Sequence, residues 1–194
     1  MTHSLLSRAW RCVLAVLAVP LTATIAIGAI AEGVTIKSAE LQPTDTGYAL
    51  EANYDVNLGA ALEDMLSRGI TLTFVTEFEL VTPRWWTFNL WNRTVADFSL
   101  QHRLSYNALT RQYRLAFGAL HQNFDNVAEA LTVLGRVRYA SAVRNEDIDP
   151  DVVYLAALRL RLDTSQLPKP LQIDALASND WRLSSDWYRW TFKP

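Results

Sequence analysis

The chain has 194 residues, of which 50% are hydrophobic, so it can build at least one ordinary hydrophobic core. Its 18 basic and 20 acidic residues give a net charge of −2. This balance argues against nucleic acid or an anionic membrane surface as the main partner, because both reward clustered positive charge.

Residues 1–31 have the organisation of a secretory signal peptide. Arg8 and Arg11 precede an apolar run that ends on an Ala-Ile-Ala triplet before Glu32. A basic start, an apolar centre and small residues at the cleavage site characterise such signals. We therefore expect export to the periplasm. The alternative is retention as an inner-membrane anchor that faces the periplasm, because an apolar run of about 20 residues can span a bilayer. The membrane is an expected partner only in that case.

Residues 32–194 are expected to form a single domain. Without Arg8 and Arg11, the 18 basic residues of the chain fall to 16, against 20 acidic residues. The only cysteine, Cys12, lies in the signal, so the domain must be held by a hydrophobic core and not by disulfides. No linker rich in glycine and serine and no block of charge divides this segment.

Alternation of apolar and polar residues predicts strands along most of this domain. The strands are predicted at 34–41, 50–58, 70–80, 98–106, 112–122, 136–143 and 152–162. Each has one polar face, which favours antiparallel sheets packed face to face. We therefore expect a mainly β fold, an antiparallel, immunoglobulin-like β-sandwich of seven or eight strands.

Two short helices are expected at the ends of the sandwich, where the spacing of apolar residues changes. They are predicted at 59–68 and 125–134, with Asp125 as the cap of the second. Further along, Pro168 and Pro170 predict a stiff, extended connector between the last strand and the C-terminal tail.

Tryptophan is distributed unequally along the expected domain. Six of the seven tryptophans follow residue 31, and they fall in the connection 83–94 and in the tail 181–190. Indoles with arginines between them are common anchors of protein interfaces and also stack on sugars. The alternative is a satellite core, in which the tail covers the connection. The candidate binding residues are Arg84, Trp85, Trp86, Trp91, Arg93, Trp181, Trp187 and Trp190.

No catalytic or metal-binding constellation is recognisable, so we expect a protein that is not an enzyme and carries no cofactor or metal. His102 and His121 lie in different strands without a second ligand at metal-binding spacing. His102 falls on an apolar face, which favours a hydrogen-bonded core histidine. Glu77 and Glu79 point outward and predict a solvated face.

Several motifs resemble those of one known family. They are 84–86, 104–114, 160–163 with 167–171, and 180–187. Together they are similar, in order and over essentially the whole chain, to the proteobacterial domain-of-unknown-function 4390 family. That family has no established activity, so no catalytic residue is carried over. Its genes often lie beside a membrane sensor histidine kinase of the nitrogen-regulation type, which the resemblance makes a candidate partner and no more.

The expected function is the binding of this sensor kinase, or of another envelope protein, through the tryptophan-rich connection and tail. Modulation of the kinase would follow from such binding. The alternative is a small-ligand binding module, in which a sugar, a peptidoglycan fragment or a lipid stacks on the same indoles.

Overall fold

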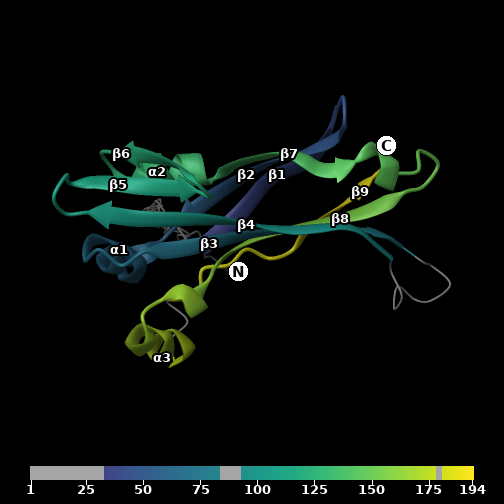
Figure 1. Cartoon of the computed structure of the whole chain (residues 1–194). Coiled ribbons are helices and arrows are strands. Elements are labelled where there is room, and N and C mark those ends of the chain that lie inside the picture. The colour runs from purple at the N-terminus through teal and green to yellow at the C-terminus, as the bar shows by residue number, and fades with distance from the viewer. Residues whose placement is uncertain (1–32, 84–92, 178–180) are drawn as a thin grey trace, which may run out of the picture.

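The computed structural model describes residues 33–83, 93–177 and 181–194, which form a mainly β fold (Figure 1). The predicted signal therefore lies outside the described residues. Nine strands and three α-helices are present in the described ranges. The strands are β1 (Gly33–Thr44), β2 (Gly47–Asn57), β3 (Leu72–Thr82), β4 (Arg93–Asn107), β5 (Gln112–Phe117), β6 (Leu120–Phe124), β7 (Arg136–Arg144), β8 (Tyr154–Leu162) and β9 (Tyr188–Phe192).

The strands form two sheets in which every pair is antiparallel, as predicted. The smaller sheet has the order β1-β2-β7, and the larger has the order β6-β5-β4-β3-β8-β9. The inner faces of the two sheets meet. The ring of Phe98 on β4 lies 4.6 Å from that of Tyr139 on β7, and Tyr48 on β2 lies 4.9 Å from Phe192 on β9. The predicted antiparallel sandwich is thus confirmed.

The core lies between these sheets and is built by the alternation that predicted the strands. Leu50 on β2 and Phe74 on β3 are fully buried, and Phe78 is 2% exposed. Phe78 lies at the centre of the larger sheet, opposite Phe98 of β4 on one side and Leu158 of β8 on the other. It therefore connects the packing of three strands.

The two predicted helices are present as α1 (Gly59–Ser67) and α2 (Val127–Leu134). Asn126, and not the predicted Asp125, caps α2, because its side chain accepts a 2.8 Å hydrogen bond from the backbone N–H of Glu129. The Asn126 amide also donates to the Glu129 carboxylate at 2.7 Å. This reciprocal arrangement satisfies the start of the helix.

Three elements differ from the prediction. The segment predicted as one strand over 112–122 is the hairpin of β5 and β6, which turns at Gly118 with a φ of 57°. The predicted extended connector contains the start of a third helix, α3 (Lys169–Ala177). Pro170 lies in its first turn, where the missing N–H of proline has no helical partner to lose. The tail also contains the ninth strand, β9.

The segment after β8 includes α3 and then returns to run beside β8, where Leu162 N–H donates to Leu183 O at 2.7 Å. In Figure 1, α3 hangs below the larger sheet. Leu167 and Leu183, which flank α3, are buried in the core cluster, and Trp181 packs against it. None of the helices in the described ranges is long and apolar enough to cross a bilayer.

His102 is a buried core residue, as predicted, but the predicted hydrogen bond is missing at one ring nitrogen. The residue is 5% exposed, its Nδ1 has no hydrogen-bond partner, and its ring meets Phe117 edge-on at 4.8 Å. Burial lowers the pKa of His102 from 6.5 to about 4. The neutral imidazole is therefore the form that the folded protein accommodates.

We expect the contribution of His102 to the stability of the protein to fall as the pH drops from about 6.5 towards about 4 and to level off below, because the unfolded chain protonates His102 first. The His102 contribution to this loss is at most about 3 kcal/mol. Urea unfolding at several pH values measures it. His102→Gln should flatten the profile, whereas a change at the exposed His121, His121→Gln, should not. An identical profile in His102→Gln would contradict this expectation.

Candidate functional site

The sequence-predicted binding residues are placed in three different ways. Arg84, Trp85, Trp86 and Trp91 lie outside the described residues, and Arg93 is an exposed residue at the start of β4. Trp181 and Trp190 are partly buried and pack against the core, with Trp190 6.2 Å from the Phe78 ring. These two indoles thus contribute to packing. Trp187 belongs to a different cluster.

That cluster, which we call the arginine clamp, consists of Glu77 on β3, Arg159 and Arg161 on β8, and Trp187. Arg159 Nε donates to Glu77 Oε2 at 2.9 Å, and Arg159 Nη2 donates to the same oxygen. Arg161 Nε donates to Glu77 Oε1 at 2.7 Å. The guanidinium carbon of Arg159 lies 4.5 Å from the centre of the Trp187 ring. The guanidinium of Arg159 therefore links the carboxylate to the indole.

The clamp forms because alternation puts these side chains on one face of the larger sheet. Glu77 and Arg159 are directly opposite each other in the register of β3 and β8, and such opposite charges stabilise a strand pair. Ser185 fixes the tail beside β8. Its N–H donates to Leu160 O at 2.9 Å, and its hydroxyl accepts from Leu160 N–H at 3.1 Å. Trp187 follows two residues later.

The electrostatics of the clamp keep Glu77 ionised. Partial burial alone would raise the pKa of Glu77, but the hydrogen bonds from Arg159 and Arg161 and their positive charges outweigh it, so the pKa lies below its ordinary value. The outward position of Glu77 predicted a solvated face, but the residue is instead held in a partly buried ion pair. Its side chain is only 22% exposed.

A hollow of about 510 Å³, which we call the acidic recess, lies beside the clamp on the same sheet face. Its polar wall is formed by Glu77, Glu79, Thr94, Asp97, Ser99 and Trp187. Glu79 and Asp97 are directly opposite each other in the register of β3 and β4, and both are exposed. Among the described residues, neither carboxylate forms a salt bridge. The recess thus carries two adjacent negative charges without a described counter-ion.

The comparisons with known proteins place the recess and the clamp inside a family domain. A family model described as "Domain of unknown function (DUF4390)" matches residues 31–191. The chain belongs to the DUF4390 family. No curated protein and no solved structure matches it. The matched range of this DUF4390 protein includes all four residues of the arginine clamp and the whole acidic recess.

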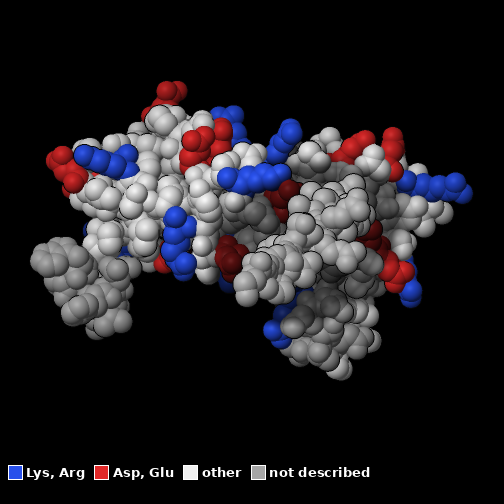
Figure 2. Space-filling model, turned by 180° about the vertical axis from the view of Figure 1, so that it is seen from behind, with Lys and Arg blue, Asp and Glu red and all other residues white. Residues whose placement is uncertain are grey.

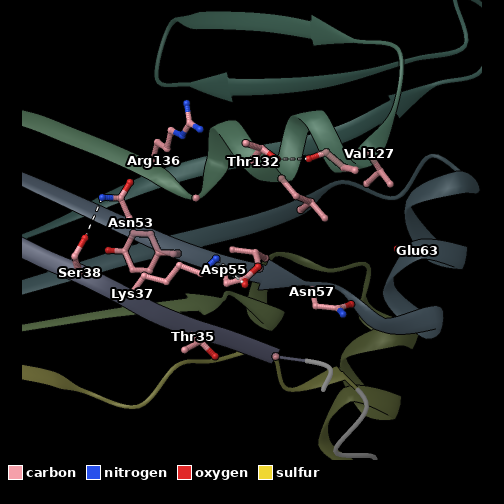
Figure 3. Close-up of a pocket in the computed structure, with 16 residues that line it drawn as sticks. Thr35, Lys37, Ser38, Asn53, Asp55, Asn57, Glu63, Val127, Thr132 and Arg136 are labelled. Atoms are coloured by element: carbon pink, nitrogen blue, oxygen red, sulfur yellow. Dashed lines mark hydrogen bonds and ion pairs between the residues drawn. The ribbon is translucent and has the colours of Figure 1, made fainter. Parts of the chain in front are cut away.

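A larger hollow of the DUF4390 protein, of about 880 Å³, lies over β1, β2 and α2 (Figure 3). Its wall is mixed, and several of its polar groups already bind one another. Lys37 Nζ lies 2.9 Å from Asp55 Oδ2, and Asn53 Nδ2 donates to Ser38 Oγ at 3.0 Å. No tryptophan lines this hollow. It therefore lacks both the indole and the unbalanced charge of the acidic recess.

The exposed Arg93 faces a third hollow of this DUF4390 protein, together with Glu146, Asp147 and Asp149. Glu146 and Asp147 are already paired with Arg144, at 2.5 and 2.9 Å. Within the described ranges, no group of three or more His, Cys, Asp or Glu side chains could hold a metal ion. Arg144 thus offsets part of the negative charge of this turn.

The clamp of the DUF4390 protein yields a stability prediction. Glu77→Gln is expected to cost about 1–3 kcal/mol, because it leaves two partly buried arginines without their shared carboxylate. Urea unfolding measures the loss. The matched control is Glu51→Gln, whose partner Arg138 is 71% exposed, and it should cost less than about 1 kcal/mol. Equal losses in both variants would show that the clamp is no stronger than a surface pair.

Proposed function

We propose that this DUF4390 protein is a non-enzymatic, protein-binding module of the cell envelope, and that the face of the larger sheet around the acidic recess binds the partner. The observation that carries the proposal is the recess itself. An indole held by an arginine forms part of its wall, and two neighbouring carboxylates without a described counter-ion lie beside it. Tryptophan and arginine are the side chains most enriched among the hot spots of protein interfaces.

Two further observations support a protein partner. His102, one of the two histidines after residue 31, is buried against Phe117, where no substrate can reach it. Figure 2 shows basic and acidic side chains interspersed over the face that it presents, with no extended area of positive charge. Nucleic acids and anionic membranes favour such an area. The signal-like residues 1–31 support the envelope location.

Photo-cross-linking in cells tests the proposal. A photoreactive residue at Ser99, which lines the recess and is exposed, should capture one envelope protein that mass spectrometry identifies. The same residue at Gln122, an exposed position on the edge strand β6, is the control and should not capture it. The first partner to examine is the membrane sensor histidine kinase that the motif resemblance implies.

The proposal fails if positions 99 and 122 give the same cross-links, or if position 99 gives none. A small ligand that occupies the recess is the competing function. In that case position 99 would give no protein cross-link. Native mass spectrometry of the protein purified from cell envelopes would then detect the ligand as an added mass.

A further inference from the structure

We infer that the acidic recess receives a basic side chain, arginine or lysine, from the partner protein. This inference rests on the proposed function and specifies the chemistry of the partner at that surface. The occupant is inferred from charge complementarity, from the strand register that places the two carboxylates, and from the indole beside them.

The recess carries two carboxylates that no described cation contacts, while Arg103 on β4 and Arg189 on β9 lie elsewhere on the same sheet face. Glu77 binds Arg159 and Arg161, and Asp163 lies 3.7 Å from Arg161. These four charges cancel. Glu79 and Asp97 remain, and both belong to the recess or its rim with no described cation in contact. A cation that enters between them gains attraction from both carboxylates.

The register places the two carboxylates at the spacing that one cation can bridge. Glu79 and Asp97 are directly opposed in adjacent antiparallel strands, where Cβ atoms lie about 4.5–5.5 Å apart. Like charges in such a position repel each other and lower the stability of the strand pair. A guanidinium or an ammonium group would remove this repulsion, and a guanidinium can donate to both carboxylates at once.

The indole adds a second contact for a cation. Trp187 lines the recess, whereas Arg159, which stacks on the same indole, does not. Trp187 is only partly buried, so a cation in the recess would lie beside an indole that already stacks on one guanidinium. The hydroxyls of Thr94 and Ser99 at the recess can accept further hydrogen bonds from the same group.

Binding of defined peptides to the purified protein tests the inference. The probes are fluorescein-labelled tetra-arginine and tetra-glutamate, measured by anisotropy at low salt. The indole N–H resonance of Trp187, assigned by its absence from Trp187→Phe, reports contact at the recess. We expect tetra-arginine to bind and to shift this resonance. The variant Glu79→Gln/Asp97→Asn should weaken binding by about 10-fold or more.

The matched control has the same change in net charge. Glu40 and Asp45 are exposed and belong to neither the recess nor the clamp, so Glu40→Gln/Asp45→Asn should change the affinity by less than about 2-fold. The recess variant removes a repulsion, so its unfolding midpoint should not be lower than that of the unchanged protein. A normal midpoint ensures that weaker binding is not a folding defect.

Each other outcome overturns the inference. Equal weakening in both double variants would indicate nonspecific charge attraction. A Trp187 shift with Ca²⁺ but not with tetra-arginine would assign the recess to a metal ion. If cross-linking at position 99 persists in Glu79→Gln/Asp97→Asn, the inference fails but the proposed function stands. If position 99 captures no protein in the unchanged chain, the proposed function fails, and the inference that rests on it fails too.

Discussion

Gly47→Ala is expected to destabilise the protein by about 3 kcal/mol or more, because an added methyl group has no space. Gly47 begins β2 and pairs with Arg144 of β7. A Cβ atom at this position would lie 2.0 Å from Val143 O and 2.9 Å from Arg144 Cα. Both atoms belong to the backbone, so no side-chain rotation can relieve the clash. β7 would have to separate from β2 at this end of the smaller sheet.

Chemical denaturation measures this loss, and Gly118→Ala is the control. Gly118 has a φ of 57°, but no heavy atom lies within 4 Å of a Cβ built there. The control variant therefore carries only the backbone cost of the left-handed conformation, about 1–2 kcal/mol. A loss in Gly47→Ala that does not exceed the loss in Gly118→Ala would show that the approach of β7 to Gly47 is not close in solution.

Phe78→Ala is expected to cost about 3–5 kcal/mol, because the cavity would open at the centre of the larger sheet. Phe78 is 2% exposed, and its ring lies 5.0 Å from Phe98 and 6.2 Å from Trp190. The substitution removes packing from β4 and β9 together. Tryptophan emission should also change in the folded state, since Trp190 loses an aromatic neighbour.

Phe78→Leu provides the comparison for this core position. It keeps an apolar side chain of similar length and should cost less than about 2 kcal/mol. Both variants are measured by urea unfolding, with near-ultraviolet circular dichroism as a check on packing. If the free energy of unfolding of Phe78→Ala lies within about 1 kcal/mol of that of the unchanged protein, the packing of β4 and β9 does not depend on this ring.

The strands and the layer arrangement were predictable because one face of each strand is buried. Leu50 and Phe74 lie at positions where the alternation of the sequence predicted inward side chains, and both are fully buried. The alternation has a period of two, so it determines the face of each residue without reference to the partner strand. The helices α1 and α2 were predictable from the change of period.

The elements that were not predicted lack such a pattern. The prolines of α3 are compatible both with an extended connector and with the first turn of a helix, and packing decides between the two. In the hairpin of β5 and β6, only Gly118 indicated the turn. β9 is five residues long and was not separated from the tail, because its aromatic residues suggested binding.

The acidic recess could be predicted only in part. The outward direction of Glu77 and Glu79 followed from alternation, but their surroundings depend on strand order. Glu79 meets Asp97 through the pairing of β3 with β4, and Trp187 reaches the clamp only because the tail runs beside β8. The complementary outward charges of 77–79 and 159–161 were a signal for the pairing of β3 with β8 that the sequence interpretation did not use.

The clamp between Glu77 and Arg159 also has a consequence for the rate of folding. The two residues are 82 positions apart in the chain, whereas β4, β5 and β6 pair with their immediate neighbours. Closing a loop of this length costs chain entropy before any contact forms. We therefore expect the hairpins to form early and the joining of β3 to β8 to limit the rate, with folding in milliseconds to seconds, as in other proteins rich in distant strand pairs.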